Sequence, residues 1–431
     1  MASTVFGVPV TDLFDFLETP GSESMNFLNE VALRYPDAVS FAAGRPSEEF
    51  FSIEAVHRYV DVYVEHLRRQ AGQDEAVVCR TLLQYGRTKG IIDDLVAQSL
   101  LIDEGIDVDA ESIVITVGAQ EAMWLILRAL RRTADDVVLT VSPGYAGLNG
   151  AAALADVKVL AVRGAPNGLD LADLGRTLRR ARASGHRPRA LYLNTDFANP
   201  TGLSLDRPTR TALLRIAERE GILLIEDSPY GIFGNERDSL PSLKALDRTN
   251  QVVYVGSFAK SGFPGARVGF IVADQTVTKP DGRSGLLADE VAKIKSLLTV
   301  NTSPISQALI GGKLLEHGLS MRAANKREIT LYQRNLRHLL RELDTAFPAD
   351  RSTGISWNRP EGGFFLLLDL PFAVGDGDLE RSAREHGVLW TPMHLFHGDG
   401  RPRRSIRLSF SHLTPSEITE GVRRLAAFVR S

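Results

Sequence analysis

Cysteine is almost absent from this chain, with Cys79 the only one in 431 residues. An internal disulfide framework is therefore excluded, and a lone thiol is typical of a reducing compartment. Membrane-length apolar runs are also missing, since FFLLLDLPF at 364–372 is short and contains an aspartate. The start MASTVFGVPVTDLFDFLETP lacks the basic beginning and apolar core of a secretion signal. We therefore expect a cytoplasmic protein.

The chain also lacks a strong charge of either sign. Its 50 Lys and Arg residues oppose 53 Asp and Glu residues, giving a net charge of −3. Such a balance offers no basic field to nucleic acid or to an anionic membrane. Histidines such as His57, His66 and His186 are scattered, and one cysteine cannot complete a metal cluster with them. We expect no metal, no nucleic-acid partner and no membrane partner.

Length and strand pattern indicate two domains. A chain of 431 residues is too long for one simple core. Between about residues 110 and 275, apolar β-branched runs alternate with helical stretches. This pattern predicts an α/β fold with a mostly parallel seven-stranded sheet sandwiched by helices. The predicted strands are 113–116, 137–141, 157–162, 191–194, 222–226, 252–256 and 269–273.

Beyond about residue 300 the pattern changes to that of a smaller α+β domain. It predicts a long charged helix at 318–343, strands at 363–368 and 405–410, and a closing helix at 411–429. Residues 1–60 carry too few strand signals to fold alone, so we expect them to pack across to the small domain. The expected division is this segment, a large domain at 61–305 and a small domain at 306–431.

Lys260 is the most informative residue because of its surroundings, SFAKSGFPGARVG at 257–269. It follows an apolar strand, where a lysine is costly unless it is used. Lysine forms Schiff bases with carbonyl compounds, and pyridoxal phosphate chemistry depends on that reaction. Ser257 and Arg267 could hold the phosphate of such a cofactor.

Further polar residues follow strand ends, where ligands gather in open α/β sheets. Gly118 opens a predicted helix whose free amides suit a phosphate, although an ordinary strand-to-helix turn explains it too. Asn199 precedes a proline and could bind a phenolic oxygen or belong to a plain turn. Asp227 could pair with a protonated pyridine nitrogen or merely cap a helix.

Segments in one order along most of the chain carry a family resemblance. The chain resembles the fold-type I aminotransferases that depend on pyridoxal phosphate, in the class I/II group, and is most similar to their aminoadipate and aromatic branch. The order and spread of the segments make this resemblance specific. The segments are LQYGRTKG at 83–90, VGAQEA at 117–122, SPGY at 142–145, NPTG at 199–202, EDSPYG at 226–231, SFAKSGFPGARVG at 257–269, PEGGFF at 360–365 and SIRLSF at 405–410.

The resemblance implies roles around the cofactor ring. Lys260 would form the Schiff base with pyridoxal 5'-phosphate and carry protons. Asp227 would pair with the pyridine nitrogen, and Asn199 and Tyr230 would reach the phenolic oxygen. Tyr145 would stack on the ring as a third catalytic residue, although a tyrosine after Pro-Gly is by default a turn aromatic.

The resemblance also implies contacts for the phosphate and the substrate. Arg407 would bind the substrate α-carboxylate together with Asn199, or else be a surface arginine on an edge strand. Tyr85 would reach the phosphate of a neighbouring subunit in a homodimer, or else be a core tyrosine. The residues expected at the phosphate are Ala119, Gln120, Ser257 and Arg267.

Some positions depart from the family pattern. Ala119 and Ala259 stand where hydroxyl residues are frequent, which removes side-chain contacts to the phosphate but leaves the backbone amides. Met393 and His394 occupy a substrate-facing loop that commonly carries glycine, so substrate identity is left open. Gly44 and Arg45 match a segment near the substrate side chain, where Arg45 could bind a distal group or merely cap the loop.

The leading hypothesis is a transaminase that moves an amino group between an α-amino acid and a 2-oxo acid by a ping-pong mechanism. A PLP-dependent oxidase, lyase or decarboxylase would use the same fold and cofactor. A ligand-sensing regulator with an aminotransferase-like domain is a third reading. Such a regulator needs a DNA-binding domain before that domain, whereas here the family segments begin by Tyr85. The substrate could be aromatic, an arylglycine, aminoadipate or branched-chain.

Overall fold

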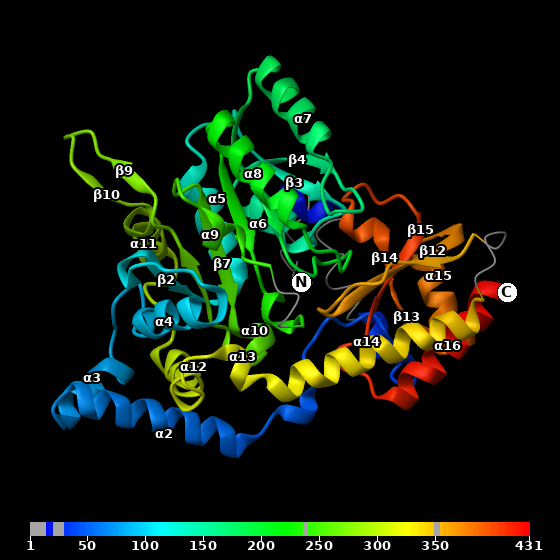
Figure 1. Cartoon of the computed structure of the whole chain (residues 1–431), viewed down its shortest axis with the longest axis horizontal. Coiled ribbons are helices and arrows are strands. Elements are labelled where there is room, and N and C mark those ends of the chain that lie inside the picture. The colour runs from blue at the N-terminus through cyan, green and yellow to red at the C-terminus, as the bar shows by residue number, and fades with distance from the viewer. Residues whose placement is uncertain (1–13, 20–29, 236–239, 349–353) are drawn as a thin grey trace, which may run out of the picture.

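The computed structural model of the chain describes residues 14–19, 30–235, 240–348 and 354–431. A seven-stranded sheet and a four-stranded sheet lie beside each other, each with its own helices (Figure 1). In these described ranges, no helix has the length and apolar character needed to cross a bilayer.

The seven-stranded sheet has the order β2-β8-β7-β6-β5-β3-β4. β8 is antiparallel to both of its neighbours, and the remaining neighbours pair in parallel. β2, β7 and β8 are buried along nearly their whole length, which accounts for their continuous apolar sequences. The strands are β2 (Ile113–Thr116), β3 (Asp136–Ser142), β4 (Lys158–Arg163), β5 (Arg187–Asn194), β6 (Leu223–Asp227), β7 (Val252–Ser257) and β8 (Gly269–Val272).

Helices cover both faces of this sheet. Val114 and Ile225 belong to a core with α5, α6 and α11, whereas their neighbours Ile113 and Leu224 belong to cores on the other face. This alternation is the two-residue period of a strand buried on both sides. The helices are α2 (Ile53–Gln70), α3 (Glu75–Leu83), α4 (Asp93–Glu104), α5 (Gly118–Leu130), α6 (Ala146–Leu154), α7 (Leu171–Ala183), α8 (Arg207–Glu220), α9 (Leu243–Leu246), α10 (Phe258–Ser261), α11 (Leu287–Leu298), α12 (Pro304–Glu316) and α13 (Met321–Ala324).

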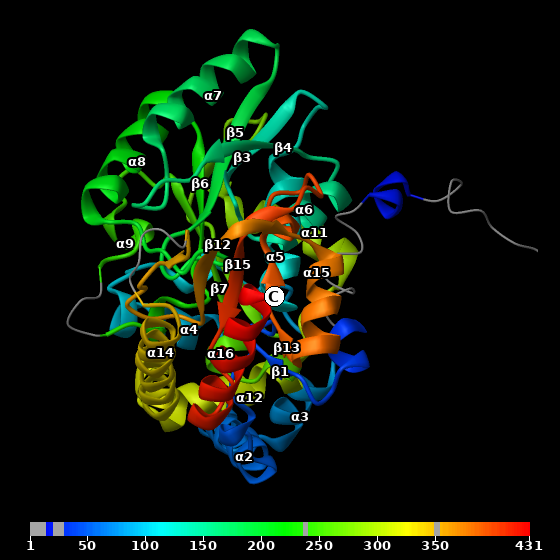
Figure 2. The ribbon, with the colours of Figure 1, turned by 90° about the vertical axis from the view of Figure 1, so that its right-hand side faces the viewer.

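The small sheet has the order β11-β12-β15-β14 and is antiparallel. Figure 2 shows β12 and β15 from this side, with α14, α15 and α16 around them. A short strand pair joins β1 to β13 in parallel, and a hairpin of β9 and β10 extends from the large sheet side. The elements are α14 (Lys326–Ala346), α15 (Asp376–Arg381), α16 (Pro415–Arg430), β1 (Val39–Ser40), β9 (Thr276–Thr278), β10 (Ser284–Leu286), β11 (Ser356–Trp357), β12 (Phe365–Val374), β13 (Val388–Leu389), β14 (Thr391–Pro392) and β15 (Arg403–Ser409).

The predicted fold class is confirmed, including every predicted strand of the large sheet. The predicted start of the long charged helix at residue 318 was wrong. Gly318 and Leu319 have φ angles of +63° and +64°, so the backbone turns there and α14 begins only at Lys326.

The predicted domain limits stay a prediction. We propose that residues 39–41 belong with the small domain, because Phe41 donates its N–H to Leu389 and accepts one from Ser409. The limit at residue 305 falls within α12, which packs against α2 and α4. Residues 1–13 and 20–29 of the predicted N-terminal segment lie outside the described residues.

Candidate active site

A cavity of about 320 Å³ lies where the carboxyl ends of the large-sheet strands meet the small sheet. Asp227 ends β6 and Ser257 ends β7, while Arg407 comes from β15 on the opposite side. Strand ends of an open α/β sheet are the usual place for a ligand. The sequence-predicted residues that line the cavity are Gly44, Ala119, Gln120, Tyr145, Asn199, Asp227, Tyr230, Ser257, Lys260, Arg267 and Arg407.

Lys260 projects from α10, the short helix that follows β7. Its Nζ donates a hydrogen bond of 2.8 Å to the carbonyl oxygen of Gly44. Burial lowers the pKa of Lys260 to about 8, and the nearby positive charges of Arg407 and Arg267 act in the same direction. An amine with this pKa is partly neutral near physiological pH and can act as a nucleophile or base.

Asp227 is a buried carboxylate at the end of β6. The hydroxyl of Tyr192 donates to its Oδ2 at 2.5 Å, and the side-chain amide of Asn194 donates to the same oxygen at 3.1 Å. Burial raises the pKa of Asp227 to about 6, although both hydrogen bonds oppose that rise.

The other carboxylate oxygen of Asp227, Oδ1, is buried without a hydrogen-bond partner among the described residues. A buried acceptor without a donor is costly, so such an atom marks a place for a ligand donor. A protonated pyridine nitrogen offers the N–H and the positive charge that this oxygen lacks.

The first turn of α5 and Arg267 form the other end of the site. Gly118 has φ +75°, and a Cβ placed on it would lie 2.4 Å from Nη2 of Arg267, so only glycine fits there. Ala119 and Gln120 follow in the first turn, where amides are free and the helix dipole favours an anion. Amides beside a guanidinium suit a phosphate.

Two polar side chains near this end already have protein partners. Ser257 caps α10 by accepting the N–H of Ala259 at 3.2 Å. Gln120 donates its side-chain amide to the carbonyl of Gly147 at 2.7 Å, which ties α5 to α6. The backbone amide of Gln120 is therefore the group with which this residue can reach a phosphate.

Arg407 is buried at 5 % exposure and has no carboxylate within 4 Å in the part of the chain that the structure describes. Its Nη1 donates to Asn199 Oδ1 at 2.7 Å, and its Nη2 donates to the carbonyl of Ala42 at 2.6 Å and to Thr391 at 3.0 Å. Burial lowers the pKa of Arg407 to about 10. A buried cation held only by neutral groups favours binding of an anion.

Two aromatic rings fix the plane of this guanidinium. The Cζ atom of Arg407 lies 4.3 Å from the ring centre of Phe365 and 5.0 Å from that of Phe396. Both rings line the cavity, so they stack on the cation and exclude water from one part of its surface.

Tyr145 and Tyr230 contribute aromatic walls. Tyr145 precedes α6, and burial raises its pKa to about 12. Tyr230 lies three residues beyond β6, and burial raises the pKa of its hydroxyl too, while a hydrogen bond with Asn199 opposes that rise. Both phenols are therefore neutral donors at physiological pH.

Arg45 does not line the cavity. Its guanidinium lies 3.2 Å from Glu48 and is largely exposed, while its carbonyl accepts a hydrogen bond from Ser411. The predicted contact of Arg45 with a substrate side chain stays a prediction and would require this exposed pair to separate.

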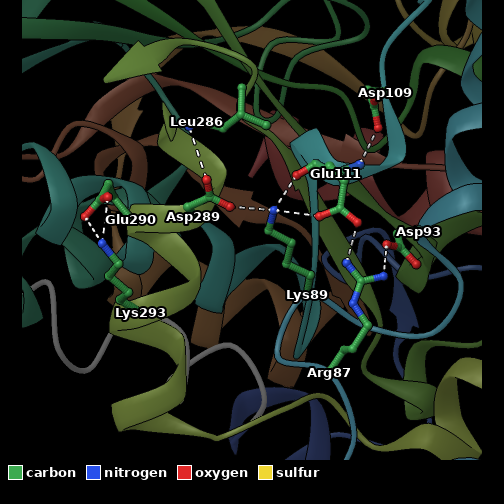
Figure 3. Close-up of polar contacts among 9 residues, drawn as sticks. All are labelled: Arg87, Lys89, Asp93, Asp109, Glu111, Leu286, Asp289, Glu290 and Lys293. Atoms are coloured by element: carbon green, nitrogen blue, oxygen red, sulfur yellow. Dashed lines mark hydrogen bonds and ion pairs between the residues drawn. The ribbon is translucent and has the colours of Figure 1, made fainter. Parts of the chain in front are cut away.

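Tyr85 does not line the cavity either. Arg87 and Lys89, which follow it in the sequence, belong to an ionic cluster (Figure 3). Lys89 Nζ lies 2.7 Å from Asp289 and 3.2 Å from Glu111, and it donates to the Glu111 carbonyl. Arg87 bridges Glu111 and Asp93. The cluster joins the Tyr85 segment to α11 and α4, while the Tyr85 side chain itself is 81 % exposed.

Some residues of the site carried no sequence signal. Tyr192 is an alternating residue within an apolar strand and looked like core, yet its hydroxyl binds Asp227. In the loop singled out at Met393 and His394, those two side chains are buried outside the cavity. Leu395 and Phe396 line it instead.

The donors and acceptors of the cavity fit pyridoxal phosphate. Asp227 has an acceptor for a ring N–H, the α5 turn and Arg267 suit the phosphate, and Lys260 supplies the amine. Across the described ranges there is no group of three or more His, Cys, Asp or Glu side chains arranged for a metal ion.

Comparisons with known proteins agree with this site. Residues 60–425 match the family model described as Aminotransferase class I and II. The (S)-3,5-dihydroxyphenylglycine transaminase of Amycolatopsis orientalis is 55 % identical over 96 % of this chain and 92 % of its own.

Two similar solved structures carry a form of the cofactor. The kynurenine aminotransferase of Pyrococcus horikoshii in complex with PMP is 26 % identical with a TM-score of 0.81, covering 96 % of this chain and 95 % of its own. The alpha-aminoadipate aminotransferase of Thermus thermophilus, complexed with N-(5'-phosphopyridoxyl)-L-leucine, is 30 % identical with a TM-score of 0.75, covering 95 % and 96 %. The chain therefore belongs to the aminotransferase class I and II family and is a fold-type I transaminase that uses pyridoxal 5'-phosphate to move an amino group between an α-amino acid and a 2-oxo acid.

Proposed function

We propose that the amino acid substrate of this transaminase is an arylglycine, whose aromatic ring is attached directly to the α-carbon. The observation that carries the proposal is the apolar part of the cavity wall, which includes Ala42, Leu395 and Phe396. Among the described residues, the cations lining the cavity are Lys260, Arg267 and Arg407, so none of these residues is left there for a distal carboxylate. The 55 % identity to a dihydroxyphenylglycine transaminase points the same way.

Arg407 binds the α-carboxylate in this proposal. Its guanidinium is held by Asn199, Ala42 and Thr391 and lies close to two aromatic rings, so it is oriented before the substrate arrives. Because one guanidinium serves one carboxylate, the amino acid and the 2-oxo acid would use the cavity in turn, as a ping-pong mechanism requires. Fixed orientation of the substrate aligns the breaking bond with the cofactor.

The remaining residues hold the cofactor in this proposal. Pyridoxal phosphate supplies a ring that accepts the electron pair left at the substrate α-carbon. Asp227 holds the ring nitrogen in its protonated form, since Oδ1 is the acceptor that lacks a donor. The phenolic oxygen of the cofactor would lie toward Asn199 and Tyr230. The phosphate of the cofactor would bind Ala119, Gln120, Ser257 and Arg267. Tyr145 would pack on the cofactor ring.

Lys260 moves the proton. Its Nζ is partly neutral because its pKa is lowered to about 8, so it can take the α-proton and later return one. The Gly44 carbonyl, 2.8 Å away, fixes the direction of the amine. We assign Gly44 this positioning role in addition to its place in the cavity wall.

We also propose a homodimer in which Tyr85 reaches the cofactor phosphate of the second subunit. Tyr85 and Leu83 are 81 % and 75 % exposed on a segment that ionic contacts hold rigid. Exposed apolar side chains on a rigid segment suit an interface between copies.

An exposed, unpaired Cys79 is consistent with a cytoplasmic location.

A donor panel tests the proposed substrate. Conversion of the cofactor to its aminated form, followed by absorbance in a single turnover, should be fastest with (S)-arylglycines. We expect leucine and 2-aminoadipate to be slower by about 10² in the apparent second-order rate constant, as for a poorly matched side chain. A faster reaction with 2-aminoadipate than with every arylglycine would contradict the proposal.

The titration of Lys260 tests its role as the proton carrier. In the cofactor-free protein, trace acylation mapped by mass spectrometry should show Lys260 reacting with a midpoint near pH 8, because burial and Arg407 disfavour the ammonium form. Lys293, which is exposed and paired with Glu290, serves as the control for access of the acylating reagent.

In the same experiment, Arg407→Gln should move the Lys260 midpoint upward, since it removes a nearby positive charge. The proposed role would be wrong if Lys260 showed no midpoint near pH 8 and its reactivity did not respond to Arg407→Gln.

Tyr85→Phe tests the dimer and the crossing contact together. Loss of one hydroxyl donor to a charged phosphate should weaken cofactor affinity by roughly tenfold, while the dimer persists. Sedimentation equilibrium and a cofactor titration measure the two effects. A fully active wild-type monomer, or a Tyr85→Phe protein with unchanged cofactor affinity, would remove the crossing role.

A further inference from the structure

A second cavity of about 300 Å³ lies behind Lys260. We call it the Lys313 cavity, because Lys313 of α12 is its most buried charged group. Its walls come from α2, from the segment before α2 and from the start of α14, elements that meet at the lower middle of Figure 1. Lys260 lines both cavities, so the two are separated by little more than that residue.

Lys313 is only 5 % exposed and has no carboxylate within 4 Å among the described residues. Its Nζ donates to the carbonyl of Ser261 at 2.8 Å and lies 5.6 Å from the ring centre of Phe263. An ammonium carries three donors, so two remain without a protein acceptor in the described chain. Burial lowers the pKa of Lys313 to about 8.

The surrounding charges leave an excess of positive charge. Arg58 is balanced by Glu316, which it contacts at 2.9 Å. Arg327 stacks 5.2 Å from the ring centre of Phe50 and has no carboxylate within 4 Å in the described part of the chain. Among the described residues that line the cavity, Glu328 is the one carboxylate. Its single negative charge does not balance the two positive charges of Lys313 and Arg327.

We propose that the Lys313 cavity binds a small carboxylate, with Lys313 and Arg327 as its ligands. A buried ammonium with two free donors is costly alone, and a carboxylate supplies both acceptors and the missing negative charge. A cavity of about 300 Å³ accommodates a small organic acid. Lys313 and Arg327 line this cavity and not the active-site cavity, and neither has a role in the proposed mechanism.

Binding of malonate to the enzyme with its cofactor tests the proposal, since malonate has neither an amino nor an oxo group to react. Equilibrium dialysis with labelled malonate should find two sites per chain in the wild type, one at Lys313 and a weaker one at Arg407, where the second carboxylate of malonate has no cation of its own. The variant Lys313→Met should weaken the second site by roughly tenfold or more, the scale of a lost charged hydrogen bond. The control Lys293→Met changes an exposed lysine and should keep both sites.

Lys313→Met should still fold, because replacing a buried charge by an apolar side chain of similar length is often neutral or stabilising. If Lys313→Met fails to fold, the variant Arg407→Gln still tests the proposal, because that protein should keep the Lys313 site and bind one malonate. A single wild-type site that disappears with Arg407→Gln would overturn the proposal, and so would two sites in Lys313→Met. If Arg407→Gln left both sites intact while Lys313→Met lost one, the role of Arg407 would fail and the Lys313 site would stand.

Discussion

The burial of Asp227 is the constraint on which the site depends. Holding this carboxylate ionised with a pKa near 6 instead of 3.8 costs roughly 3 kcal/mol relative to water. This cost is what remains after Tyr192 and Asn194 donate hydrogen bonds to Oδ2, and nothing in the described chain donates to Oδ1. The fold thus keeps an acceptor ready for a cationic N–H, and we propose that the cofactor ring supplies one.

The other charges of the cavity complement this arrangement. Lys260, Arg267 and Arg407 place positive charge opposite one carboxylate, and a cofactor phosphate of about two negative charges balances most of the excess. A nearby positive charge disfavours the ammonium form of a lysine and so lowers its pKa. Arg407 and Arg267 therefore help to keep Lys260 partly neutral. In the proposed mechanism, the arginines that bind the anions are therefore the same groups that prepare the Lys260 amine for proton transfer.

Sequence reasoning found the residues whose chemistry is unusual for their position. A lysine after an apolar strand and an aspartate ending another were visible because charged residues are rare there. Tyr192 was invisible because an aromatic residue in a strand is the ordinary core pattern. A cavity-lining role could not be assigned to Phe396 from the sequence, because Met393 and Phe396 are apolar residues of one loop. Only the fold decides that Phe396 faces the cavity and that Met393 does not. The start of α14 was misplaced because the helical spacing was read from Gly318 onward, although the backbone at Gly318 and Leu319 is left-handed and α14 begins only at Lys326.

The ¹⁵N chemical shift of the cofactor ring nitrogen tests the central claim most directly. In the wild type at pH 8, the shift should be that of a protonated pyridine, because the Asp227 carboxylate stabilises the positive charge beside it. In Asp227→Asn, which keeps the shape and removes the charge, the shift should be that of the neutral ring. A nitrogen that stays protonated in Asp227→Asn would contradict the account, and Asp227 would then be a structural residue at the end of β6.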